Sequence, residues 1–190
     1  MTTAVTGIQN GPSNWLRNYA YARFAFSAVW VLAAFTLATG SPAIAGALLV
    51  VYPAWDALAN VVDARRSGGL AGNRTQMFNI VISALTTLAV IVALTQSMAG
   101  VVAVFGVWAV LSGILQLATG LRRWSAGGQW AMVLSGAQSA LAGGFFVVSA
   151  NTMNNPDITL IAPYAAFGAF YFLVSAIWLT VKDAGGNRAA

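Results

Sequence analysis

Six long apolar segments dominate this sequence and restrict the folds open to it. Each has roughly 20 mostly apolar residues, the length an α-helix needs to cross the hydrocarbon core of a bilayer. They run approximately over 16–38, 42–62, 76–94, 98–121, 129–150 and 158–181. Because unpaired sheet edges cannot face lipid, we expect helices rather than strands. The sequence therefore predicts an all-α membrane protein with six transmembrane helices.

Charge and the absence of two residue types support this prediction and exclude several functions. Charged residues make up 7% of the 190-residue chain, against about 25% in soluble domains. There is no cysteine and no histidine, so disulfides, imidazole-ligated haem and the usual zinc sites are excluded. We expect no metal and no cofactor.

The positive charges predict how the chain sits in the membrane. All nine fall in the predicted connections and tail of one side, or near the helix ends there: Arg17, Arg23, Arg65, Arg66, Arg74, Arg122, Arg123, Lys182 and Arg188. Cytoplasmic loops carry such an excess, so we expect both termini in the cytoplasm and the chain in the bacterial cytoplasmic (inner) membrane. Basic residues beside a membrane attract anionic lipid. We expect lipid as a partner and no nucleic acid, and leave a homo-oligomer open.

The domain organisation follows from the same segments. We expect a polar N-terminal tail over 1–14, without the features of a cleavable signal peptide. A single transmembrane domain covers 15–183, with hairpins at about 15–66, 75–123 and 129–183. Residues 184–190 form a C-terminal tail.

A repeat is visible in regularly spaced serines. Ser27, Ser83 and Ser139 follow one another at intervals of 56 residues. Gly-Gly pairs follow the second, fourth and sixth segments at a similar spacing. Three helical hairpins in the same orientation would be related by an axis along the membrane normal. We therefore predict a pseudo-threefold arrangement of three repeated hairpins.

Each repeated serine has a polar residue one helical turn before it, which places both on one face. The pairs are Arg23 with Ser27, Asn79 with Ser83, and Ser135 with Ser139. Polar groups in lipid need partners, so these faces should turn inward. One interpretation is close helix packing through small residues, as in the series Gly136, Ala140, Gly144. The other is a polar cavity that opens toward the cytoplasm and is closed at its outer end.

Asp56 lies deep in the second segment and at the same predicted depth as Arg23 in the first. We predict an ion pair between them, extended by Asn60 one turn after Asp56. The pair could lock the first hairpin, or it could serve a ligand. The candidate ligand-binding residues are Arg23, Ser27, Asp56, Asn60, Asn79, Ser83, Ser135, Gln138 and Ser139. The deep tryptophans Trp30, Trp55, Trp108 and Trp178 are interpreted as core or lipid-facing packing.

Enzymatic function has little support in the sequence. There is no close pair of carboxylates, no Ser/His/Asp set and no P-loop. Asp56 and Asp63 share a helix face, but no second acidic cluster accompanies them. Catalytic residues are therefore unknown, and we expect a protein that is not an enzyme.

The segment GVWAVLSGILQLATGLRRWSAGGQWAMVLSGAQSALAGGFFVVSA, residues 106–150, resembles the repeat of the HdeD-type acid-resistance membrane proteins, a short-repeat family of unknown function. The matching features are Trp108, Ser112-Gly113, Arg122-Arg123, Trp130, Ser135-Gly136 and Gly143. The resemblance implies a six-helix plan over about 19–183 and a stress-related role.

Three functional hypotheses remain. The first is a non-enzymatic, stress-related membrane protein that acts through lipid or protein contacts. The second is a small-molecule or ion transporter or channel with a polar cavity in its inner half. The third is a membrane enzyme acting on a lipid or isoprenoid.

Overall fold

The computed structural model describes residues 12–66, 69–70, 74–122, 124–126 and 130–186. Within these residues the chain forms six long α-helices and two short 3₁₀ helices, and no strand. The long helices are α1 (Pro12–Thr36), α2 (Pro42–Arg66), α3 (Arg74–Leu94), α4 (Met98–Arg122), α5 (Trp130–Thr152) and α6 (Ala162–Gly186). The short ones are η1 (Trp124–Ala126) and η2 (Ile158–Leu160). Parts of the predicted tails, Gly-Gly pairs and basic charges lie outside the described residues. These parts are residues 1–11, Gly68, Arg123, Gly127, Gly128 and residues 187–190.

Several helices extend beyond the apolar segments that predicted them. α1 begins at Pro12, inside the predicted tail, and α2 continues to Arg66. Proline suits a first helical turn, because its missing N–H would have no partner there. Polar ends can remain helical because they lie where water and headgroups replace the hydrocarbon. Apolar composition therefore predicts the membrane-spanning middle of each helix more accurately than its ends.

The connections far from the termini are short and closed by side-chain caps. The Ser41 Oγ accepts from the amide of Ile44 (3.4 Å) at the start of α2, and the Ser97 Oγ accepts from the amide of Gly100 (3.1 Å) at the start of α4. Asp157 accepts from the amide of Thr159 (2.8 Å), which forms the short helix η2 before α6. The sixth predicted segment is thus divided, and α6 itself begins at Ala162.

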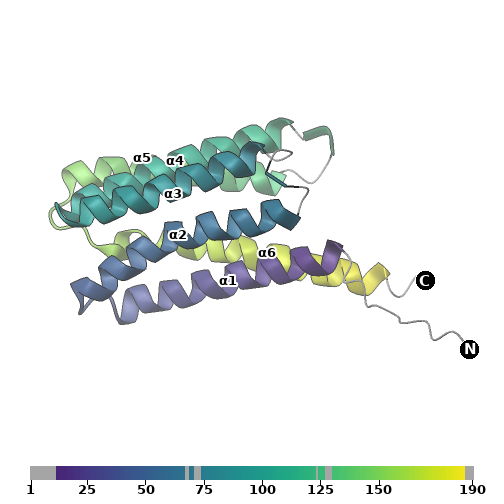
Figure 1. Ribbon diagram of the computed structural model, residues 1–190, viewed down its shortest axis with the longest axis horizontal. Coiled ribbons are helices and arrows are strands. Elements are labelled where there is room, and N and C mark those ends of the chain that lie inside the picture. The colour runs from purple at the N-terminus through teal and green to yellow at the C-terminus, as the bar shows by residue number, and fades with distance from the viewer. Residues whose placement is uncertain (1–11, 67–68, 71–73, 123, 127–129, 187–190) are drawn as a thin grey trace, which may run out of the picture.

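The six long helices run side by side along the long axis of the molecule (Figure 1). The most extensive packing joins α4 to α5, α1 to α6 and α2 to α3, whereas α1 with α2 and α5 with α6 make few contacts. Because α6 packs against α1, the bundle closes on itself. The ion pair of Arg17 with Asp183 (3.1 Å) and the hydrogen bond between Tyr21 and Thr180 (3.2 Å) support this closure.

The two ends of the bundle differ in chemistry. We call the end where α1 begins and α6 ends the basic end, because the described Arg17, Arg65, Arg66, Arg74, Arg122 and Lys182 lie at or near it. The other end, the apolar end, holds the buried core, with Trp30, Leu49, Val101, Phe105 and Ile161 each at most 2% exposed. Packed apolar side chains therefore close the bundle at the apolar end.

The α4–α5 pair is held by very close backbone contact. A Cβ added at Gly113 would lie 2.6 Å from the carbonyl oxygen of Gly136, and one at Gly143 would lie 2.5 Å from that of Gly106. The prediction that Gly144 contacts a neighbouring helix is wrong, since a Cβ there meets nothing within 4 Å. The other two predicted residues do make the contact, since a Cβ at Gly113 would lie 2.6 Å from Ala140 as well as from Gly136. The glycines at the crossing recur every seven residues, as expected for two helices crossing at a small angle.

Large apolar side chains cover the outside of the bundle. Leu141 is 76% exposed, Trp178 71%, Val29 66% and Leu32 64%. A soluble monomer rarely exposes such a continuous apolar surface. All six long helices are long and apolar enough to cross a membrane. The fold therefore defines a multi-pass membrane protein.

Candidate functional site

A cavity of about 980 Å³ lies inside the bundle, and side chains from all six long helices line it. Arg74, Gln76 and Thr119 line it near the basic end, while Ser27, Tyr52 and Tyr164 lie farther along their helices toward the apolar end. Tyr52 lies against Trp30 and Trp108, with ring centroids 4.7 and 6.0 Å away. These rings join the cavity to the apolar core, so the cavity reaches the basic end and has a packed floor.

Most of the predicted site residues surround this cavity. Eight of the nine line it: Arg23, Ser27, Asp56, Asn60, Asn79, Ser135, Gln138 and Ser139. The ninth, Ser83, is fully buried and donates a hydrogen bond to Asp56, which does line it. The three repeated serines therefore all face the interior, as predicted. Whether these residues bind a ligand stays a prediction.

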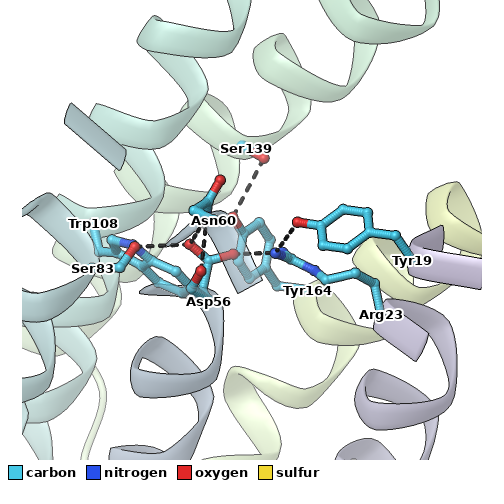
Figure 2. Close-up of polar contacts among 8 residues, drawn as sticks. All are labelled: Tyr19, Arg23, Asp56, Asn60, Ser83, Trp108, Ser139 and Tyr164. Carbon is cyan, nitrogen blue, oxygen red and sulfur yellow. Dashed lines mark hydrogen bonds and ion pairs between the residues drawn. The ribbon is translucent and has the colours of Figure 1, made fainter. Parts of the chain in front are cut away.

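Asp56 is the centre of the polar network (Figure 2). Its Oδ1 accepts from the Nη2 of Arg23 at 2.5 Å, which confirms the predicted ion pair. Its Oδ2 accepts from the Oγ of Ser83 at 2.8 Å and from the Nδ2 of Asn60 at 3.1 Å. The carboxylate thus joins α1, α2 and α3, and its charge is compensated by one cation and two neutral donors.

The network continues into the core through Ser83. The indole of Trp108 donates to the Oγ of Ser83 at 3.1 Å, so this hydroxyl both donates and accepts. This connection adds α4 to the three helices already joined at Asp56. The ion pair itself is mostly buried, with side-chain exposures of 12% for Arg23 and 18% for Asp56. Charges this far from water are stable only when paired and hydrogen-bonded.

Local sequence explains how α2 presents Asp56. Asn60 lies one turn after Asp56, and its amide donates to both the main-chain oxygen and the carboxylate of that residue. Pro53, inside the helix, has no N–H and removes one hydrogen bond from the preceding turn. In the same region the carbonyl of Leu48 accepts from the indole of Trp30 at 2.7 Å. The proline therefore sits where a neighbouring helix bonds to the α2 backbone.

Polar contacts also cross from α5 to its neighbours. Ser135 accepts from the amide of Gln116 on α4 at 3.2 Å. On the other side, Tyr171 donates to Gln138 at 3.0 Å and Tyr164 donates to Ser139 at 3.4 Å. Because α5 and α6 make few other contacts, these tyrosines bridge the space between them.

Sequence reasoning missed the aromatic walls of the cavity. Trp55 lines it, although it was interpreted as a packing residue, and Trp108 lines it while also belonging to the buried core, as interpreted. Six further aromatic residues line it: Tyr19, Tyr52, Tyr164, Phe167, Tyr171 and Phe172. A signal was available, since Tyr164, Gly168, Tyr171 and Ser175 recur at helical spacing and all face the cavity. Other tryptophans match the interpretation: Trp30 is buried in the core, and Trp178 is exposed on the outside.

Two hydrogen-bond donors at the site have no acceptor among the described residues. They are the Nε of Arg23 and the indole nitrogen of Trp55, and both are buried. An unsatisfied buried donor costs about 1–3 kcal/mol. Less than 1 Å² of either nitrogen is accessible, so an acceptor in the cavity would reach it only after a neighbouring side chain moved. In the described part of the chain no three acidic, histidine or cysteine side chains gather as a metal site would require.

The fold and the cavity together define a class: a multi-pass membrane protein with a polar, aromatic-lined interior cavity. Sequence comparison adds a family match over part of the chain. Residues 79–148 match the family model described as a short repeat of unknown function (DUF308), the family of HdeD-like membrane proteins. This match covers less than half of the chain, but it includes most of the segment 106–150 and so confirms the resemblance seen there. No curated protein and no solved structure matched the chain.

The matched region contains the residues that α3, α4 and α5 contribute to the site from Asn79 onward. It runs from Asn79 on α3 through α4 to Val148 on α5, and so includes Ser83, Trp108, Ser135 and Ser139. Arg23 and Asp56 lie outside it. The extension of the resemblance to residues 19–183 stays a prediction.

Proposed function

We propose that this protein is a non-enzymatic protein of the bacterial inner membrane that binds a small organic molecule taken from the cytoplasm. One observation carries the proposal: a cavity of about 980 Å³, lined from all six long helices, reaches the basic end and is closed by the apolar core. Ligand cavities are typically about 300–1,000 Å³, with aromatic walls and a few convergent polar groups. This cavity has that size and that character.

The proposed orientation places the basic end in the cytoplasm, together with both termini. The positive-inside rule supports it, because the described basic side chains lie at or near that end. We also propose that three repeated hairpins are arranged with pseudo-threefold symmetry. The inward-facing Ser27, Ser83 and Ser139 support this arrangement, as does the finding that the three most extensive helix packings are those of α2 with α3, α4 with α5, and α6 with α1.

The proposal includes the setting in which binding takes place. The exposed apolar side chains would contact membrane lipid, which we propose as the constant partner of the outer surface. The stress-related role implied by the family resemblance would make the bound molecule one that accumulates, or must be retained, under stress. Growth of a deletion strain in acid, with and without the gene restored, tests that setting separately from binding.

Cysteine labelling tests access to the cavity, and the chain offers a clean background because it has no native cysteine. We expect Ser135→Cys, in the cavity wall, to react with a charged, membrane-impermeant thiol reagent in inside-out vesicles but not in right-side-out vesicles. Val102→Cys, a core position that is fully buried, is the matched control and should react in neither. An unreactive Ser135→Cys in both preparations would refute the proposal.

Native mass spectrometry tests occupancy. Protein extracted in mild detergent should carry a small molecule that is released on unfolding. Ser135→Trp, which fills the cavity, should lose that molecule, whereas Leu141→Trp on the lipid-facing surface should keep it. Retention of the same molecule by both variants would place it outside the cavity.

A transporter is the second candidate, and the closed floor favours it over a channel. A binding site near the middle of the bilayer with one open and one closed end is what one conformation of an alternating-access transporter presents. The backbones of α1 and α2, and of α5 and α6, lie close together in few places, so rearrangement there would mainly have to break side-chain contacts such as the Arg23–Asp56 pair. Counterflow of the identified molecule into proteoliposomes tests this candidate, and binding without counterflow would reject it.

A further inference from the structure

We infer that the cavity selects a small organic anion with a flat, aromatic body. This inference rests on the proposed function and names the class of ligand. Three observations carry it: the charges of the lining, the two unsatisfied donors, and the kind of apolar side chain that forms the walls.

The charges of the lining disfavour cations. Arg23, Arg74 and Asp56 are the charged residues among the described lining residues, so cationic groups exceed anionic ones. The carboxylate of Asp56 already accepts from Arg23, Asn60 and Ser83. A ligand ammonium group would therefore have to displace one of these donors.

The rim of the cavity adds to the positive potential. Arg74 lies at the first residue of α3, and Arg65, Arg66 and Arg122 lie at the same end of the bundle. Two acidic residues offset part of this charge: Asp183 pairs with Arg17, and Asp63 accepts a hydrogen bond from Gln76. A mouth lined by one sign of charge raises the local concentration of ligands of the opposite sign.

The two unsatisfied groups are hydrogen-bond donors, so a ligand that binds them must provide an acceptor. The Nε of Arg23 and the indole N–H of Trp55, the residue before Asp56, are both buried without an acceptor among the described residues. Both side chains line the cavity, and a small side-chain movement would be needed to bring either nitrogen to a ligand, since less than 1 Å² of each is accessible. A carboxylate offers two strongly accepting oxygens, and charge-assisted hydrogen bonds to it are stronger than neutral ones.

The walls are aromatic, although most apolar residues of the chain are aliphatic. Among the described lining residues there is no leucine, isoleucine, valine or alanine, and Met132 is the one aliphatic side chain. The guanidinium of Arg23 lies 4.5 Å from the ring centre of Phe172, and Trp55 stacks on Phe26 at 4.5 Å. An acyl chain gains nothing particular from such walls, whereas a flat ring can stack on them.

A matched series of probes tests the inference: 2-naphthoate, 2-naphthamide and 2-naphthylmethylammonium, which share a ring system and differ in charge. Binding is measured by calorimetry to protein in phosphatidylcholine nanodiscs, with empty nanodiscs as the blank. We expect naphthoate to bind about tenfold or more tightly than the amide, and the ammonium compound to bind weakest. Equal or tighter binding of the amide or the ammonium compound would overturn the inference.

Two variant pairs locate the effect. Arg74→Gln should weaken naphthoate binding about threefold to tenfold, whereas Lys182→Gln, which removes the same charge at an exposed position outside the lining, should change it less than about twofold. Trp55→Leu should weaken naphthoate binding, and Trp178→Leu, on the lipid-facing surface, should not. Equal effects within either pair would overturn the inference.

The outcome is separable from that of the proposed function. If no naphthyl probe binds while Ser135→Cys reacts with the thiol reagent, the ligand class is wrong and the open cavity stands. If Ser135→Cys does not react, the proposed function itself fails.

Discussion

The close crossing of α4 and α5 makes a strong prediction about Gly143→Ala. The new Cβ would lie 2.5 Å from the carbonyl oxygen of Gly106 and 2.6 Å from the amide nitrogen of Val110. Carbon–oxygen contacts normally need about 3.3–3.6 Å, so the two backbones must move apart by roughly 1 Å. Overpacking of this kind costs about 1–3 kcal/mol.

Gly144→Ala is the matched control, because a Cβ there meets nothing within 4 Å. Both substitutions gain the same helix propensity, about 0.5–1 kcal/mol, so this gain cancels when the two variants are compared. Gly143→Ala should therefore be less stable than Gly144→Ala by about 1–3 kcal/mol. The free energy of unfolding is measured by SDS titration in mixed micelles with far-UV circular dichroism. A difference below about 0.5 kcal/mol would refute the close crossing, since surface changes without a steric effect stay within that range.

Two further predictions concern the polar network and one the α5–α6 bridge. Asp56→Asn should lower the free energy of unfolding by about 3–5 kcal/mol, because it leaves the charge of Arg23 buried and unpaired. Adding Arg23→Gln should recover part of that loss in the same titration. If the effects of the two substitutions simply add, the pairing is contradicted. Ser83→Ala should cost about 1–3 kcal/mol, since the indole of Trp108 loses its acceptor, and an unchanged tryptophan emission spectrum would count against that contact. Tyr171→Phe should cost about 0.5–1.5 kcal/mol, and an unchanged stability would show that its hydroxyl does not bridge α5 and α6.

Simple rules predicted the helices and the central ion pair. Six apolar segments gave six spanning helices because bilayer thickness fixes the length of a crossing. Arg23 and Asp56 were paired by counting the rise per residue from the ends of two helices that follow each other in the chain. Both arguments use distances along single helices, which sequence alone supplies.

The aromatic walls and the glycine crossing depend on rotation of one helix relative to another, which sequence alone does not supply. Gly143 and Gly144 differ by about 100° around α5, and only the position of α4 decides which of them makes the contact. Trp55 and Trp178 likewise have the same apolar character, yet one lines the cavity and the other faces outward. Helical spacing identifies a face, but not what the face meets.

The packing of α6 against α1 has a consequence for how the protein is made. α1 enters the membrane before the helix that covers one of its sides has been synthesised. Until α6 arrives, Tyr21 lacks its partner Thr180, and Arg17 lacks Asp183. Biogenesis must therefore hold α1 in an unfinished state while the four helices that precede α6 are inserted. A ribosome stalled before α6 should leave a nascent chain that the insertion machinery or a membrane protease recognises as incomplete.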